Sequence, residues 1–251
     1  RNTSGGFLKA AGARAAEDCV LESDEDAVVY GGDIDYSQRI AATLLELLMM
    51  RKSSTQKIIY IDEEREREST YGEMCENALR IAAGMAKEGI GKRDIVIFQI
   101  DDRKLFIENF WACMLRGAVA VPVDVPDGYL SESVGSQKLM QICRAFGRSV
   151  MLTGPEHTGE VADFIAQNSL ESRAIDAQTL YQNEMLREIP EPLPADEACI
   201  YLFTSGSTGA PKGVGLSQDN VFARTLGEIQ MYGLTEKVSD FNWMNLTHAA
   251  G

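Results

Sequence analysis

Residues 204–213 hold the densest set of groups in this sequence that could bind an anion. They read Thr-Ser-Gly-Ser-Thr-Gly-Ala-Pro-Lys-Gly and lie between an apolar run and a helix-like segment. The hydroxyl groups can donate hydrogen bonds, the glycines let the backbone approach an anion closely, and the lysine adds a compact positive charge. We therefore predict a loop that binds a polyphosphate. Its candidate binding residues are Thr204, Ser205, Gly206, Ser207, Thr208, Gly209 and Lys212.

Two other interpretations of this loop are weaker. The Walker loop of kinases and ATPases needs four residues between its glycines and a hydroxyl residue directly after the lysine. Here Gly206 and Gly209 are too close together, and Gly213 stands where that hydroxyl should be. A flexible Ser/Gly turn would not need this order of hydroxyls, proline and lysine between two apolar segments.

The elements that must position this loop alternate along the chain. Apolar runs rich in β-branched residues, typical of buried strands, alternate with amphipathic stretches of helical period. Strands are predicted at 94–100, 118–123, 149–153 and 198–203, and helices at 102–116, 134–146 and 160–168. Such alternation predicts an α/β fold, with helices on both faces of a mainly parallel sheet.

Residues 1–68, which precede these elements, give separate predictions of local structure. Residues 1–35 are rich in Gly, Ala, Ser and acids without a sustained period, and we interpret them as a linker or mobile arm. Residues 36–51 have apolar residues at helical spacing, 57–61 resemble a strand, and the charged run 63–68 is predicted to be a solvated turn.

A capping box predicts where the next helix begins. Thr70 is followed three residues later by Glu73, so each can satisfy a backbone N–H of the first turn, and Gly89 is placed to end the helix. One apolar stripe is predicted to face the core, and it comprises Met74, Ala78, Ile81, Ala82 and Met85.

Residues 201–214, which read YLFTSGSTGAPKGV, resemble the phosphate-loop signature of the acyl-adenylate-forming (AMP-binding) superfamily. This superfamily includes acyl-CoA synthetases, fatty-acyl-AMP ligases and nonribosomal peptide synthetase adenylation domains. Further segments resemble its other motifs in the same order: STYGE at 69–73 with GKRDIVI at 91–97, WACMLRGAVAVPVD at 111–124, and NWMNLTHAAG at 242–251. The resemblance implies that residues 36–251 are the N-terminal portion of an adenylation domain, incomplete at the C-terminus.

The resemblance also implies a reaction. A carboxylate attacks the α-phosphate of ATP, with Mg²⁺, to give an acyl-adenylate and pyrophosphate. The acyl group then passes to a thiol, either of CoA or of the 4′-phosphopantetheine of a carrier-protein domain in a larger synthetase. The family's adenine and ribose sites and its adenylation lysine would lie beyond Gly251, so residues 1–251 alone are expected to be inactive.

The segment 242–251 resembles the family's acyl-pocket segment. Amino-acid-activating members usually carry an Asp here that pairs with the substrate ammonium, and residues 241–251 contain no acid. The resemblance therefore favours a fatty, aryl or other non-amino acid and implies that His248 is a catalytic residue bordering the pocket. Asn245, Thr247 and Gln218 depart from the family pattern. An amino-acid adenylation domain and a non-catalytic nucleotide-binding scaffold stay open as alternatives.

The amino-acid composition limits the kinds of partner that this protein can bind. A formal net charge of −14 argues against nucleic acid or an anionic membrane, and the longest apolar stretch, 40–50, is shorter than the roughly 20 residues of a spanning helix. The five cysteines form no C-x-x-C pair, so we expect reduced thiols and a cytoplasmic protein. With only His157 and His248 present, a histidine-based metal cluster is not expected, and no metal ligand is assigned.

Overall fold

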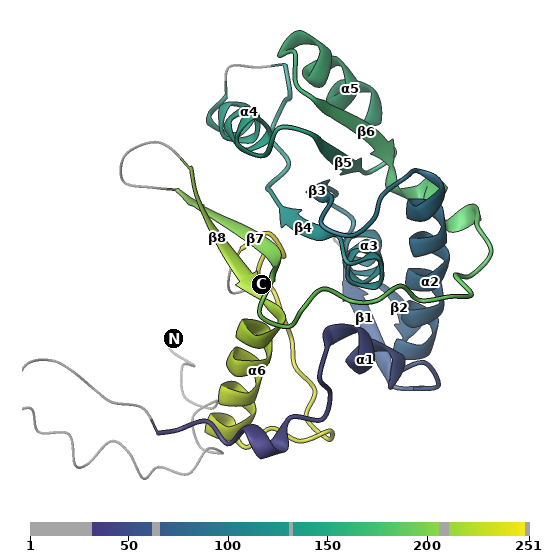
Figure 1. The fold of residues 1–251 in the computed structure, drawn as a ribbon, viewed down its shortest axis with the longest axis vertical. Helices are drawn as coiled ribbons and strands as arrows, with labels where there is room; N and C mark the ends of the chain where they lie inside the picture. The colour runs from purple at the N-terminus through teal and green to yellow at the C-terminus, as the bar shows by residue number, and fades with distance from the viewer. Residues whose placement is uncertain (1–31, 62–65, 131–132, 206–210, 249–251) are drawn as a thin grey trace, which may run out of the picture. The chain divides into compact units, whose positions relative to one another are not determined.

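The computed structural model describes residues 32–61, 66–130, 133–205 and 211–248. The chain divides into two compact units, one made of 1–39 with 223–240 and the other of 40–222 with 241–251. We describe each by itself. Among the described residues, all strands belong to the larger unit, in one two-stranded and one six-stranded sheet (Figure 1).

A six-stranded sheet with the order β6-β5-β3-β4-β7-β8 is the centre of the larger unit. Its strands are β3 (Ile95–Gln99), β4 (Val119–Pro122), β5 (Ser149–Thr153), β6 (Ser172–Asp176), β7 (Ala198–Ser205) and β8 (Pro211–Ser217). Neighbouring strands pair in parallel from β6 to β7, and β8 pairs antiparallel with β7. The predicted mainly parallel α/β sheet is confirmed.

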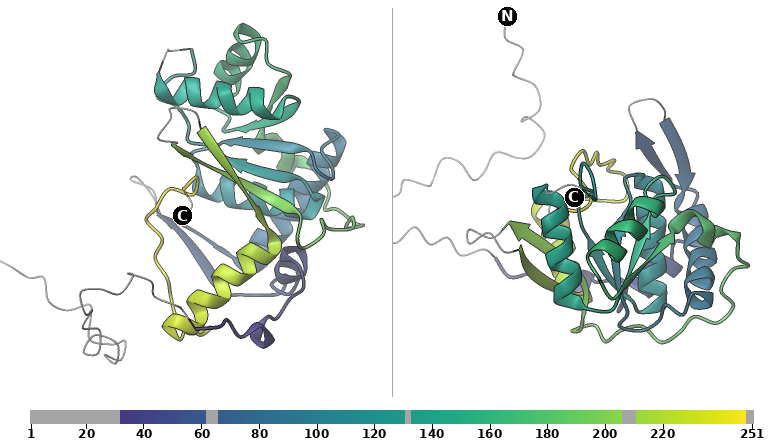
Figure 2. Two further views of the ribbon diagram at one scale, coloured as in Figure 1. Left: turned by 60° about the vertical axis from the view of Figure 1, so that its left-hand side comes forward. Right: turned by 90° about the horizontal axis from the view of Figure 1, so that it is seen from above.

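Helices cover both faces of this sheet, as predicted (Figure 2). Along β3, Val96 and Phe98 belong to the buried cluster that includes α2 (Tyr71–Lys87) and α3 (Arg103–Arg116). Ile97 between them belongs to the opposite cluster, with side chains of α4 (Val134–Phe146) and α5 (Thr158–Gln167). Because successive strand residues point to opposite faces, a strand buried on both sides reads as one continuous apolar run.

Helix α2 begins as the sequence predicts. Thr70 and Glu73 form a complete capping box, and the whole predicted apolar stripe is buried. Gly89 adopts a φ of 72° after the last turn, in the left-handed region that a residue with a side chain rarely adopts.

Two predictions were wrong in detail, and one strand was missed. Helix α1 covers only Leu44–Met49 of the predicted 36–51, because the Thr43 hydroxyl caps α1 by accepting from the Glu46 N–H, and η1 is a separate turn at Tyr36–Gln38. The charged run was predicted to be a turn, but Glu66–Thr70 is strand β2, antiparallel to β1 (Lys57–Ile61). Strand β6 was missed, because its mostly polar sequence carries no apolar signal at the sheet edge.

The smaller unit is described through 32–39 and 223–240. It includes most of α6 (Gln218–Tyr232), and Gln230 closes a two-way link to the backbone of Asp35. The Asp35 N–H donates to Gln230 Oε1 at 3.0 Å, and Gln230 Nε2 donates to the Asp35 carbonyl at 2.8 Å. Most of the predicted arm, 1–31, lies outside the described residues. Within the described part, no helix has both the length and the apolar character needed to cross a membrane.

Candidate functional site

The described residues of the predicted phosphate loop lie at the end of β7 and the start of β8. Thr204 pairs with Lys212 across the two strands, and Ser205 pairs with Pro211. Thr204 and Lys212 are exposed there, while Gly206, Ser207, Thr208 and Gly209 fall outside the described residues. Helix α6 after the loop begins at Gln218, and strand β8, which was not predicted, lies between the loop and this helix.

Two glycines after the loop have a packing role in the strand. A Cβ atom at Gly213 would lie 2.9 Å from the ring of Phe203, its partner across the hairpin. At Gly215 it would lie 3.1 Å from the ring of Tyr201. Gly213 was predicted to shape the anion-binding loop, but it belongs to β8 and leaves room for an aromatic ring. The aromatic residues of β7 therefore lie opposite the glycines of β8, an arrangement that becomes visible only once the two strands are paired.

Aromatic stacking holds the hairpin against α4. Phe146, the last residue of α4, meets Tyr201 and Phe203 edge to face, with ring centroids 5.3 and 5.9 Å apart. Such pairs contribute roughly 0.5–1.5 kcal/mol each beyond the area they bury. Strand β7, which ends near Thr204, is therefore attached to α4 by Tyr201 and Phe203, the rings that lie opposite the glycines of β8.

Gln218 has a structural explanation. It is 4% exposed, its Oε1 accepts from the Leu44 N–H at 2.8 Å, and its Nε2 donates to the Leu193 carbonyl at 2.9 Å. In the sequence, Gln218 departs from the family pattern, and that departure left the identity of the substrate open. In the structure, its buried amide joins α6 to α1 and to the connection before β7.

A carboxylate that the sequence reasoning missed reaches the predicted acyl-pocket segment. Asn245 Nδ2 donates to Asp124 Oδ1 at 3.2 Å, and the Thr247 hydroxyl donates to the same oxygen. Lys138 Nζ lies 3.9 Å from the other carboxylate oxygen. Asp124 follows β4, so the carboxyl edge of the sheet supplies the acid that the segment itself lacks.

A cavity of about 250 Å³ lies beside this segment. It is lined by Ile100, Asp101, Arg103, Phe106, Val125, Trp243, Asn245, Leu246 and Thr247. His248 is exposed on the same turn, and its backbone N–H donates to the Asn245 carbonyl at 3.0 Å. The structure thus places Asn245 and Thr247 at the cavity wall and His248 directly after them in the chain.

The family of this chain follows from a comparison with known proteins. The model of the family "AMP-binding enzyme" matches residues 50–251. The chain belongs to this family. Feruloyl-CoA synthase of Amycolatopsis sp is 31% identical to it over 153 residues, which is 61% of this chain and 29% of that protein.

Solved structures agree with this AMP-binding assignment. The structure of McyG A-PCP complexed with phenylalanyl-adenylate has a TM-score of 0.74 and 30% identity, over 81% of this chain and 32% of that one. The adenylation domain of a keto acid-selecting NRPS module bound to keto acyl adenylate has a TM-score of 0.80 and 25% identity, over 87% of this chain and 41% of that one. The chain spans less than half the length of these relatives.

Two described residues of the predicted phosphate loop carry groups of the kind that bind phosphate. Adenylate-forming enzymes generally use ATP and Mg²⁺, with CoA or a carrier protein as acyl acceptor. Thr204 and Lys212 present a hydroxyl and an ammonium side by side on an otherwise acidic protein. An ammonium and hydroxyl donors are the groups that bind phosphate oxygens.

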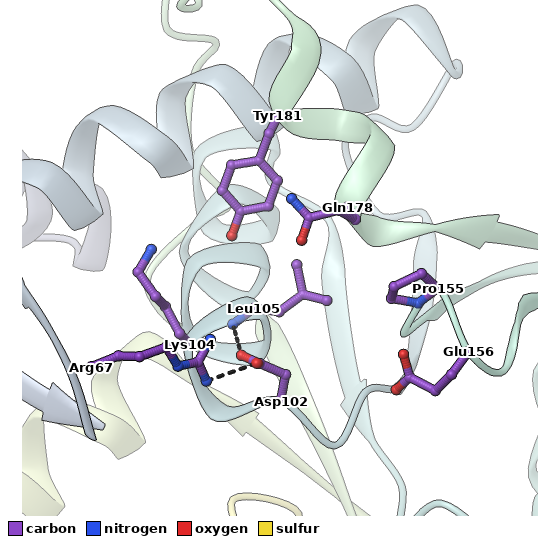
Figure 3. Close-up of a pocket in the computed structure, with 8 residues that line it drawn as sticks. All are labelled: Arg67, Asp102, Lys104, Leu105, Pro155, Glu156, Gln178 and Tyr181. Atoms are coloured by element: carbon purple, nitrogen blue, oxygen red, sulfur yellow. Dashed lines mark hydrogen bonds and ion pairs between the residues drawn. The ribbon is translucent and has the colours of Figure 1, made fainter. Parts of the chain in front are cut away.

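A second hollow, of about 450 Å³, lies near the carboxyl ends of β3, β5 and β6 (Figure 3). Its walls are Arg67, Asp102, Lys104, Leu105, Pro155, Glu156, Gln178 and Tyr181. Arg67 pairs with Asp102 at 2.7 Å, and Asp102 caps α3 by accepting from the Leu105 N–H at 2.9 Å. Burial alone would raise the pKa of Asp102, but the Leu105 N–H and the Arg67 guanidinium outweigh it and lower that pKa.

The buried carboxylate of Glu108 binds two of the side chains that line this hollow, Lys104 and Tyr181. Glu108 has no exposed surface and accepts from Lys104 Nζ at 2.6 Å, from Asn77 Nδ2 at 2.9 Å and from the Tyr181 hydroxyl. Burial and the Glu108 charge raise the pKa of Tyr181, which keeps its proton for this hydrogen bond. Because each partner satisfies the carboxylate, the network braces α2, α3 and η2 (Ala177–Gln182).

The cysteines of the described residues are buried and free. Burial raises the pKa of Cys199 to about 11 and that of Cys143 to about 12. Since the thiolate is the reactive form, burial makes these core thiols less reactive than an exposed cysteine. Cys19 lies outside the described residues.

Proposed function

We propose that this chain supplies the phosphate-binding and part of the acyl-binding surface of an ATP-dependent ligase that activates a carboxylic acid. The reaction forms an acyl-adenylate and pyrophosphate, and the acyl group then passes to the thiol of CoA or of a carrier protein's 4′-phosphopantetheine. The observation that carries the proposal is the pairing of β7 with β8, in which Thr204 and Lys212 are direct partners across the two strands.

Charge is the main obstacle to this reaction. The attacking carboxylate and the triphosphate are both anions, and the bond to pyrophosphate breaks with further negative charge on the leaving oxygens. In our proposal, Lys212 binds the β- and γ-phosphates, and Thr204, Ser205, Ser207 and Thr208 donate hydroxyl hydrogen bonds. Mg²⁺, when bound with ATP, neutralises the remaining charge.

We further propose that the acid is a fatty, aryl or other non-amino acid. Asp124 already accepts from Asn245 and Thr247 through its Oδ1 atom. An α-ammonium would compete with both donors for that oxygen. A feruloyl and a keto acyl group, for which two relatives are named, carry no α-ammonium, whereas a third relative holds phenylalanyl-adenylate. We assign His248 to the border of the acyl pocket.

The test is carboxylate-dependent ATP–pyrophosphate exchange across fatty, aryl, keto, hydroxy and amino acids. We expect exchange with a non-amino acid by a protein that carries this chain together with the remainder of the family domain. Because residues 1–251 span less than half of the relatives, we expect none from them alone. Exchange with amino acids only would replace the acid assignment, and ATP binding without any exchange would favour a non-catalytic scaffold.

A further inference from the structure

Three side chains with metal-binding atoms meet where β3 and β5 end. Asp101 follows β3, while Glu156 and His157 follow β5. His157 Nε2 lies 3.1 Å from Asp101 Oδ2 and 3.7 Å from Glu156 Oε1. One ligand atom from each of the three lies within 4.8 Å of the other two. Within the described ranges, no other three His, Cys, Asp or Glu residues come together in this way.

The topology of the sheet makes this edge a natural place for a ligand. From β3 the chain passes through α3 to β4, and from the neighbouring β5 it passes through α5 to β6 on the other side. Helices α3 and α5 lie on opposite faces, so the two connections diverge. Open α/β sheets bind ligands in the crevice at such a switch point. Glu156 also lines the 450 Å³ hollow at this edge (Figure 3).

We propose that Asp101, Glu156 and His157 form a binding site for a divalent transition-metal cation such as Zn²⁺. One imidazole nitrogen with two carboxylate oxygens is a donor set that Zn²⁺ accepts, at bond lengths of about 2.0–2.2 Å. Ligand atoms around a tetrahedral ion with such bonds lie about 3.4 Å apart. The 3.1 and 3.7 Å separations from His157 Nε2 bracket that value.

A buried hydroxyl beside the cluster is the second observation. Tyr129 is 3% exposed, and its hydroxyl is buried with no hydrogen-bond partner among the described residues. Its ring centroid lies 5.7 Å from that of His157. A water bound to the cation would provide the missing partner.

The local charge favours a cation over an anion. The N-termini of α3 and α5 each contribute about half a positive charge at this edge. Against them stand the full negative charges of Asp101, Glu156 and Glu160, while Asp102 is already paired with Arg67. A simple Asp–His hydrogen bond would explain Asp101 and His157, but it gives neither Glu156 nor the Tyr129 hydroxyl a role.

The test is titration of the chain with Co²⁺ and Zn²⁺. We expect one ion per chain, visible Co²⁺ absorption without a thiolate charge-transfer band, and a rise in Tm of about 5–10 °C when Zn²⁺ exceeds its Kd a hundredfold. H157A and E156Q should each weaken binding at least tenfold, and Y129F by a smaller factor. Glu156 is exposed, so E156Q keeps the test valid even if H157A fails to fold.

H248A and C19S are the matched controls, and both should keep the metal affinity of the unaltered chain. The proposal is overturned if neither metal binds, if H157A and E156Q bind as tightly as the unaltered chain, or if H248A or C19S abolishes binding. Zinc without any effect on Tm would show adventitious surface binding and would also overturn it.

Discussion

The paired ends of β7 and β8 and the β3/β5 edge bring polar side chains together in different ways. The hairpin takes its groups from ten consecutive residues, so their identities are visible as a motif. At the β3/β5 edge, Asp101 and His157 are 56 positions apart and meet only because β3 and β5 are neighbours in the sheet. A local site can be predicted from a motif, whereas a site built by strand order becomes visible only in the fold. The following predictions test that contrast.

The largest expected effect is at the hairpin. In a protein that carries this chain and supports exchange, Lys212→Ala should lower the ATP–pyrophosphate exchange rate about 100-fold or more, because the leaving pyrophosphate loses a charged partner. Ser207→Ala and Thr208→Ala should weaken ATP use less. Lys57→Ala removes an exposed lysine paired with Glu68 and is the control. Unchanged ATP kinetics in all three site variants would refute the phosphate assignment.

At the 450 Å³ hollow, whose wall residues Lys104 and Tyr181 bind Glu108, the largest expected effect is on the free energy of unfolding. Glu108→Ala leaves Lys104 and Tyr181 without their buried acceptor, so the free energy of unfolding should fall by about 3 kcal/mol. Urea denaturation measures this free energy of unfolding. Glu184→Ala, which breaks an exposed ion pair with Arg187, should change the stability little. Equal stabilities for the two variants would contradict the bracing role of the Glu108 network.

The aromatic–glycine pairing of the hairpin predicts a steric cost. Gly213→Ala should destabilise the chain by about 1–3 kcal/mol, because its Cβ would press on the Phe203 ring. Gly159→Ala is the matched control, since a Cβ there meets no atom within 4 Å. Adding Phe203→Ala to Gly213→Ala should remove the clash, so a double-mutant cycle that shows no coupling would argue against this packing.

The smallest effect is a pH dependence at Asp102. Its pKa is lowered in the folded chain, so its ion pair and cap contribute stability above the unfolded pKa, and that contribution is lost as pH falls through the folded pKa. Asp102→Asn should therefore lower Tm at pH 6, by the equivalent of about 1 kcal/mol, and the gap to the unaltered chain should close below the ordinary Asp value near 3.8. A difference in Tm between Asp102→Asn and the unaltered chain that stays constant with pH would contradict the stabilising role of the ionised Asp102.

Much of the fold was predictable because its signals are local. The predicted bounds of β5 and α4 agree with the structure, since apolar runs and helical periodicity are read within one segment. Strand β6 gave no such signal, and β8 was hidden by glycines whose purpose is set by the opposite strand. At the site, Asp124 stood out only as the end of a motif until the fold brought Asn245 and Thr247 to it.

The sequence by itself determined the AMP-binding signature, the alternation of strands and helices and the capping box of α2, because each depends on the order of neighbouring residues. Only the tertiary structure decided that Gln218 joins α6 to α1, that Gly213 lies under an aromatic ring and that Asp101 meets His157. Those contacts depend on which strands pair and which faces pack. That choice is made by burying the apolar surface of the whole chain, so no short stretch of sequence contains it.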